Sequence, residues 1–174
     1  MKFLVDTCIL SEQRRKHPNH SVLDWLNRID PYFSVLTVGE LEKGARKLAD
    51  AARREEVSDW IVRFRRLYER RILPVTNTEI DIWADMCARC EAAGTPLPAV
   101  DSLIAATARA HGMPVATRNV KDMLASGVAI YDPFSDAWHN RDDDSTRKDC
   151  IKYTSRMLFT ILLRRSGRNA FALS

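Results

Sequence analysis

Phe3-Leu4-Val5-Asp6, close to the start of the chain, is the stretch that decides the fold. Three consecutive apolar residues are too few for a helix and are typical of a short buried strand. An acid follows at once, and the residues from Thr7 to Leu10 include no glycine or proline that would delay a helix. A carboxylate at the C-terminal end of a central strand lies where open parallel sheets bind their ligands. Asp6 is therefore the first candidate site residue.

Strand-like and helix-like segments alternate along the rest of the chain. This alternation predicts an α/β fold with a central, mainly parallel sheet of four to five strands, covered by helices on both faces. After the first strand we expect strands at 32–36, 72–75, 114–117 and 128–131. We expect helices at 22–29, 37–49, 53–71, 80–94 and 102–110, with a helical turn at 120–124.

Size and charge set the limits of the molecule. A chain of 174 residues is expected to form one domain with its own core. Residues 1–138 contain 19 basic and 19 acidic residues, whereas 139–174 contain 8 basic and 4 acidic ones, which supply the whole net charge of +4. We therefore expect a domain at 1–136 and a basic C-terminal extension at 137–174, and global charge gives no argument that the domain binds nucleic acid.

The start of the chain lacks a signal-peptide pattern, and no segment approaches the roughly 18 apolar residues of a membrane span. We expect a cytoplasmic protein with no membrane association. Cys87 and Cys90 form a C-x-x-C pattern, but it falls inside a helical pattern without further ligands at zinc spacing. Small buried or half-buried side chains are the expected role of this pair.

Three carboxylates stand near the start of expected helices: Asp6, Glu40 and Asp101. Each has a simple structural alternative, since Asp6 and Asp101 fit helix caps and Glu40 completes a capping box with Thr37. In a parallel sheet, however, all strand-to-helix junctions lie on one edge, so the three acids are expected to converge. Three like charges repel strongly unless a cation neutralises them. Ligands that are all oxygen favour Mg²⁺ or Mn²⁺ over zinc.

Further polar residues follow the same junctions. Asn119 ends the fourth expected strand and can supply a neutral oxygen ligand or orient a water molecule, and Asp122 lies one turn further on. Thr7 and Ser102 each follow an acid, and Thr117 and Arg118 are placed to meet a substrate backbone. A hard cation held by carboxylates suits phosphate chemistry, because it lowers the pKa of a bound water and stabilises the leaving oxygen.

Five segments together resemble the signature blocks of PIN-domain proteins, and among these the VapC-like toxins of bacterial VapBC toxin–antitoxin pairs. The blocks keep the family order and span residues 1 to about 136. They are Phe3-Leu4-Val5-Asp6-Thr7, Val38-Gly39-Glu40-Leu41-Glu42-Lys43-Gly44, Asp101-Ser102-Leu103-Ile104-Ala105-Ala106-Thr107-Ala108, Ala116-Thr117-Arg118-Asn119-Val120-Lys121-Asp122, and Gly127-Val128 to Asp132-Pro133-Phe134.

This resemblance implies a three-layer α/β/α fold and a Mg²⁺- or Mn²⁺-dependent endoribonuclease. It implies Asp6, Glu40 and Asp101 as metal ligands and catalytic acids, and places Asn119 at the fourth family position. It also implies an RNA substrate, a homodimer and a small VapB-like antitoxin, whose complex with the toxin binds operator DNA. We expect antitoxin or dimer contacts on the helices at 37–49 and 53–71.

Three other functions stay open at this point. The chain could be a PIN fold that has lost its metal and acts as a binding module, although its three acids are intact. It could be an RNA-maturation nuclease without a toxin role. A phosphatase with Asp6 as nucleophile would normally carry a second Asp two residues later, where this chain has Cys8.

Overall fold

In the computed structural model of the protein, which describes residues 1–140, the N-terminal stretch forms the central strand of a six-stranded sheet. The strand order is β3-β2-β1-β4-β5-β6, and every neighbouring pair is parallel except β5 and β6. The strands are β1 (Lys2–Val5), β2 (Asp30–Ser34), β3 (Ile72–Leu73), β4 (Val115–Ala116), β5 (Ile130–Asp132) and β6 (Ala137–His139). The α/β fold with a mainly parallel sheet is confirmed.

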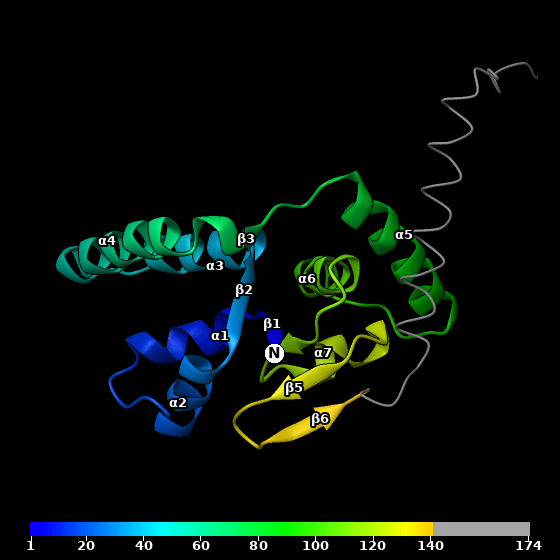
Figure 1. Ribbon diagram of the computed structural model, residues 1–174. Coiled ribbons are helices and arrows are strands. Elements are labelled where there is room, and N and C mark those ends of the chain that lie inside the picture. Colours follow the sequence, from blue (N-terminus) through cyan, green and yellow to red (C-terminus); the bar gives the residue numbers. More distant parts are fainter. Residues whose placement is uncertain (141–174) are drawn as a thin grey trace, which may run out of the picture.

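Helices cover both faces of this sheet (Figure 1). The α-helices are α1 (Thr7–Leu10), α2 (His20–Arg28), α3 (Val35–Arg46), α4 (Ala51–Leu67), α5 (Asn77–Ala92), α6 (Ala99–Ala110) and α7 (Val120–Met123). Short 3₁₀ helices follow three of them: η1 (Ser11–Arg14), η2 (Glu69–Arg71) and η3 (Leu124–Ser126). No helix within the described residues is both long and apolar enough to cross a membrane.

The side chains of β1 alternate between two separate apolar clusters, as expected for a strand that is buried on both faces. Phe3 and Val5 join the cluster formed with α1 to α4, in which Phe33 packs edge-on against Phe64 at 4.8 Å between ring centroids. Leu4 joins the cluster formed with α5, α6 and α7. The three residues are almost completely buried, so the stretch identified from the sequence lies at the centre of the molecule.

All five expected helices begin two or three residues earlier than expected, and two of these starts change the role of a named residue or segment. The capping box of Thr37 and Glu40 does not form, because α3 begins at Val35 and the Ser34 hydroxyl accepts a hydrogen bond from the Leu36 amide. The Thr37 hydroxyl is buried and has no hydrogen-bond partner among the described residues. The helix expected at 102–110 begins earlier, because residues 99 and 100 are the first two of α6.

The Cys87–Cys90 pattern lies inside α5, as expected from the sequence. Cys90 is buried and its thiol donates to the carbonyl oxygen of Ala125 at 3.2 Å. Cys87 is half-buried, and both thiols are free. Cys90 therefore packs α5 against η3.

The sheet extends three residues beyond the expected domain end at residue 136. β6 pairs antiparallel with β5, and Trp138 packs against Tyr131 and Phe3 at 5.0 and 5.8 Å between ring centroids. No periodic pattern predicts this strand, because three residues are too few to form one. The remainder of the expected extension, residues 141–174, lies outside the described residues.

We predict that chains ending after Asn140 and after Asp136 differ in stability. The shorter chain lacks β6 and the half-buried Trp138, so its free energy of unfolding is expected to fall by about 2–4 kcal/mol, near the lower end of a core tryptophan deletion. Urea denaturation followed by circular dichroism measures this difference. Equal unfolding midpoints for the two chains would show that β6 contributes nothing to the core.

Candidate active site at the carboxyl end of the sheet

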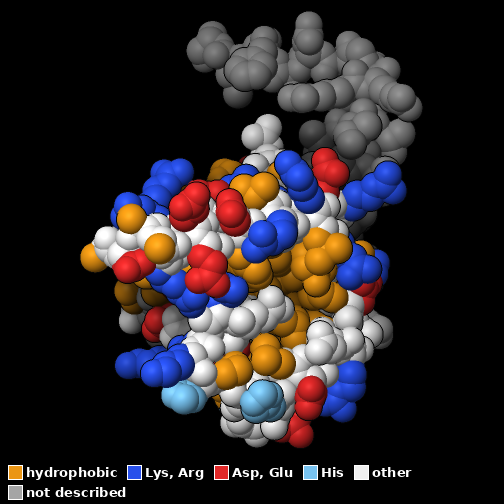
Figure 2. Space-filling model, turned by 90° about the vertical axis from the view of Figure 1, so that its left-hand side faces the viewer, with side chains coloured by type: hydrophobic (Ala, Val, Ile, Leu, Met, Phe, Trp, Pro, Cys, Tyr) orange, Lys and Arg blue, Asp and Glu red, His pale blue; other side chains and the backbone are white. Residues whose placement is uncertain are grey.

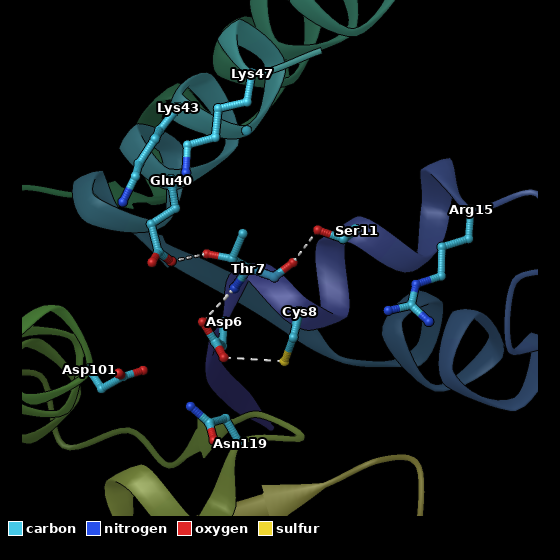
Figure 3. A pocket seen from close by; sticks show the side chains of 11 residues that line it. Asp6, Thr7, Cys8, Ser11, Arg15, Glu40, Lys43, Lys47, Asp101 and Asn119 are labelled. Atoms are coloured by element: carbon cyan, nitrogen blue, oxygen red, sulfur yellow. Dashed lines mark hydrogen bonds between the residues drawn. The ribbon is translucent and has the colours of Figure 1, made fainter. Parts of the chain in front are cut away.

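A polar cavity of about 500 Å³ opens at the carboxyl end of β1 (Figure 3). The three predicted acids enter it from different elements: Asp6 from the end of β1, Glu40 from α3 and Asp101 from the first turn of α6. These residues are up to 95 positions apart in the chain, and the fold brings them to one space. The cavity is lined by Asp6, Thr7, Cys8, Ser11, Arg15, Glu40, Lys43, Gly44, Lys47, Asp101 and Asn119.

Asp6 is held by hydrogen bonds to both carboxylate oxygens. Oδ1 accepts the Thr7 amide at 2.6 Å, which makes Asp6 the N-cap of α1. Oδ2 accepts the Thr117 hydroxyl at 2.6 Å and the Cys8 thiol at 3.2 Å. The cap predicted as an alternative role is thus present together with the site role, because a cap uses one oxygen and each carboxylate oxygen has two lone pairs. Asp6 is oriented into the cavity and is 6% exposed.

Glu40 lies in the middle of α3, six residues into the helix and on its cavity-facing side. Its carboxylate accepts a hydrogen bond from the Thr7 hydroxyl, so Thr7 links the first two acids through its amide and its side chain. Thr7 therefore orients both acids.

The pKa of Asp101 is raised in the folded protein. Partial burial raises the pKa of this carboxyl, and the negative charges of Asp6 and Glu40 raise it further. A smaller contribution to the pKa comes from the charge of Asp122. The repulsion expected among converging carboxylates is therefore present in the folded protein.

Asn119 and Asp122 form a pair beside the acids. The Asn119 side-chain amide donates to Asp122 at 2.7 Å, and its backbone amide donates to the Thr117 hydroxyl at 2.9 Å. These two bonds fix the position of Asn119, which lines the cavity. Thr117 is fully buried and acts on the site through Asp6 and Asn119.

Two further predicted substrate residues do not line the cavity. The Ser102 hydroxyl is buried, accepts the indole N–H of Trp83 at 2.9 Å and donates to the Ala99 carbonyl. Ser102 thus fastens α6 to α5. The Arg118 guanidinium lies over the Phe134 ring, 4.7 Å from its centroid. Its backbone amide donates to the Cys8 sulfur at 3.3 Å.

Sequence reasoning missed the cationic wall of the cavity, which consists of Arg15, Lys43 and Lys47. Lys43 and Lys47 are three and seven positions after Glu40, a spacing that places them on the same helix face and could have identified them. Arg15 follows η1, in a stretch that lies outside all of the expected helices and strands. It is held at 3.0 Å by the buried carboxylate of Glu12, and no periodic pattern reveals such a pair.

Cys8 was also missed as a cavity residue. Burial raises the pKa of its thiol to about 12, and the charge of Asp6 adds to the shift. The thiol is therefore protonated at neutral pH and can donate to Asp6. Its role in the structure is to hold that carboxylate beside Thr117.

As the side chains stand, no group of three or more His, Cys, Asp and Glu residues within positions 1–140 has the geometry of a metal site. The chemistry of the cavity nevertheless fits a hard cation. Its candidate ligands are carboxylate and amide oxygens, which suit Mg²⁺ and Mn²⁺. The raised pKa of Asp101 also reflects the negative charges of Asp6, Glu40 and Asp122 around it.

A family model described as PIN domain matches residues 3–123. Toxin FitB of Neisseria gonorrhoeae is 33% identical over 141 residues, which cover 79% of this chain and 99% of the relative. The VapC ribonuclease Y4jK of Sinorhizobium fredii is 32% identical over 145 residues, which cover 77% and 99% of the two chains.

Solved structures agree with these relatives. A chain in the crystal structure of FitAcB from Neisseria gonorrhoeae superposes with a TM-score of 0.73 at 33% identity, covering 77% of this chain and 99% of its own. A chain of FitAB bound to an IR36 DNA fragment gives a TM-score of 0.72 at 33% identity, with coverages of 77% and 96%. With its fold, its acids at the sheet edge and these relatives, the chain belongs to the PIN domain family.

Proposed function

We propose that this protein is the ribonuclease toxin of a toxin–antitoxin pair and hydrolyses RNA phosphodiester bonds with a Mg²⁺ or Mn²⁺ ion. The observation that carries the proposal is the convergence of Asp6, Glu40 and Asp101 in one polar cavity. Membership of the PIN domain family and the relatives named Toxin FitB and VapC ribonuclease support the same activity. A non-toxin RNA-processing nuclease and an inactive binding module are the alternatives.

The proposed ligands are the carboxylates of Asp6, Glu40 and Asp101, with the side-chain oxygen of Asn119 beside them. When bound, such a cation supplies activation of a water molecule and stabilisation of charge on the leaving oxygen. The chain contributes orientation. Thr7 and Thr117 fix the carboxylate of Asp6 through donors at 2.6 Å.

Asn119 is positioned in the same way, because its bond to Asp122 fixes the side chain at the wall of the same cavity. Burial and the charges of Asp6 and Glu40 raise the pKa of Asp101, so a bound cation would favour its ionised form.

The proposed partners are a small VapB-like antitoxin and, in the toxin–antitoxin complex, operator DNA. FitAB was solved with a DNA fragment, and that relative shares 33% of its sequence with this chain. The proposal places antitoxin or dimer contacts on α3 and α4, where Val62 and Leu67 of α4 are 47% and 76% exposed. Figure 2 shows apolar surface between basic and acidic side chains on one face of the molecule. A homodimer and a cytoplasmic location belong to the same proposal.

Asp6→Asn is expected to lower the rate of RNA cleavage by more than about 100-fold. Mutation of a residue that only orients a metal ligand already costs roughly 10–100-fold in activity, and Asp6 is itself a proposed ligand. The fold should persist, because the asparagine oxygen still accepts the Thr7 amide. Single-turnover cleavage of a panel of tRNAs and mRNAs, with and without Mg²⁺, measures the loss. The exposed Asp24→Asn is the matched control, and cleavage by Asp6→Asn at the control rate would refute the assignment.

Removal of divalent cations is expected to abolish cleavage reversibly. EDTA should stop the reaction, and addition of excess Mg²⁺ or Mn²⁺ should restore it, since the proposed ligands are hard oxygen donors. The measurement is the cleavage rate of one RNA substrate before chelation, after chelation and after each ion is added. Activity that persists in EDTA would contradict a cation held by these acids.

Asp101→Asn is expected to make the protein more stable at neutral pH in EDTA. Because the pKa of Asp101 is raised in the folded state, the folded protein binds this proton more tightly than the unfolded chain does. Stability is therefore lost as pH rises from the ordinary aspartate pKa through the raised value. The substitution removes that loss, so its advantage should vanish below the ordinary pKa.

Urea unfolding of both proteins over a pH series measures this difference. Added Mg²⁺ should reduce the stability difference between the two proteins, because an ion that binds the folded wild-type protein stabilises that state by mass action. An Asp101→Asn protein that is less stable than the parent at neutral pH in EDTA would mean that the carboxylate is held by a structural bond.

A further inference from the structure

One face of α3 carries both an acid and two lysines into the cavity. Glu40, Lys43, Gly44 and Lys47 follow the i, i+3, i+4, i+7 spacing that aligns residues along one side of a helix, and all four line the cavity. Figure 3 shows Lys43 and Lys47 further along α3 than Glu40, with their ammonium ends directed back toward Glu40. The two lysines lie roughly 6 Å apart along the helix axis. The helix face thus leads from the acids to two successive positive charges.

The charges of Lys43 and Lys47 are uncompensated within the described part of the chain. Both side chains are exposed and neither has an ion pair with another described residue. The neighbouring basic residues differ, since Arg46 and Arg65 both pair with Glu42 at 3.4 and 3.1 Å. Positive charge is therefore available to an anion at the two lysines.

Gly44 lies between the lysines and has no structural reason to be glycine. It is inside α3 with helical backbone, and a Cβ added there would meet no atom within 4 Å. Glycine in a helix interior destabilises the helix relative to alanine. What the missing side chain provides is open space at the cavity wall. The backbone of a bulky ligand can therefore approach the helix closely at this position.

The space continues on the other side of Lys43. A second hollow of about 530 Å³ shares Lys43 and Lys47 with the first, and Gly39, whose added Cβ would also meet nothing within 4 Å, lines it. Two glycines on the same helix therefore leave room on both sides of one lysine. The two hollows are lined in common by Lys43 and Lys47, and Arg65 lines the second.

The lining favours a polyanion over a protein segment. Cys8 aside, every side chain on the cavity wall within the described residues is polar or charged, or belongs to glycine. Protein partners anchor through apolar and aromatic contacts at the centre of an interface, and such contacts are missing from this wall. Single-stranded nucleic acid instead binds in positively charged grooves that follow its backbone.

We propose that the α3 face from Glu40 to Lys47 is the path of the RNA backbone next to the cleaved bond. Lys43 and Lys47 contact successive phosphates that flank the reacting one, and Gly44 admits the sugar–phosphate chain against the helix. Arg15 lines the same cavity and borders the strand, although its charge is paired with Glu12. The inference rests on the proposed ribonuclease function and names the residues that bind its substrate.

RNA binding by full-length protein tests the proposal, with Asp6→Asn as the parent so that no cleavage occurs in Mg²⁺. The affinity for a short fluorescein-labelled single-stranded RNA is measured by anisotropy over a series of KCl concentrations. Lys43→Gln/Lys47→Gln should weaken binding about tenfold and reduce the salt slope by about 1.4, because each phosphate contact on a single strand contributes roughly 0.7. Arg66→Gln/Arg70→Gln, with the same spacing and charge loss outside the two hollows, should leave the slope unchanged.

Substitution of Gly44 separates substrate binding from helix stability. Gly44→Ala and Gly44→Gln should both raise the unfolding midpoint by about 2–4 °C, because each replaces a helical glycine with a better helix former. Only Gly44→Gln, whose side chain fills the cavity wall, should weaken RNA binding several-fold.

If Lys43 and Lys47 served only to stabilise the helix dipole, the double lysine variant would have a changed unfolding midpoint and an unaltered salt slope.

The outcomes separate this inference from the function on which it rests. Equal RNA affinity and salt slope in the parent and the double lysine variant would overturn the inference and leave this face to a protein partner. The cleavage assay would still support the ribonuclease in that case. Absence of RNA binding by the parent, together with absence of cleavage by the wild-type chain, would overturn both.

Discussion

The amide of Asp6 donates a hydrogen bond to the carbonyl oxygen of Ala116, with 3.0 Å between the two atoms. This bond extends the parallel pairing of β1 with β4 by one residue and fixes Asp6 beside Thr117. The pairing lies where the strand order reverses, with β2 on one side of β1 and β4 on the other. Open sheets bind ligands at such a point because the connections leave in opposite directions and a crevice remains between them. The site depends on this single junction, since Asp6 and its orienting hydroxyl come from its two strands.

The junction brings like charges together, and the surrounding bonds make that arrangement stable enough to fold. Thr7 donates its amide to Asp6 and its hydroxyl to Glu40, so one residue of a four-residue helix serves two acids. Charged acceptors gain more from such bonds than neutral ones do. Asp101 lacks a comparable donor from another residue in the described structure. Its raised pKa means that its charged form is destabilised in the folded protein. Active sites commonly retain destabilising features of this kind, because the chemistry needs them.

The parts of the fold that sequence could predict are those with an unambiguous local signal. Apolar segments and alternation predict all five parallel strands, and the position of an acid directly after a strand predicts Asp6. The same reason does not hold for the other two acids, because Glu40 lies six residues into α3 and Asp101 is on α6, which follows α5 without a strand between them. The start of α3 was misplaced because Ser34 and Thr37 are both good caps, and only the length of β2 decides between them. Arg15 could not be found, since its position depends on a buried Glu12 that a sequence presents as one more surface charge. Long-range packing settles such cases, and local propensity does not.

The balance of charge in residues 1–138 has a consequence for how a nuclease on this fold can hold its substrate. A cavity with Asp6, Glu40 and Asp101 repels the phosphates that flank the one under attack, and a bound cation offsets that repulsion only within a few ångströms. A neutral domain gives no long-range attraction to compensate. The positive charge must therefore stand next to the acids without forming ion pairs with them. A helix face meets both conditions, because successive turns separate Glu40 from Lys43 and Lys47 along one line while keeping all three on the same wall.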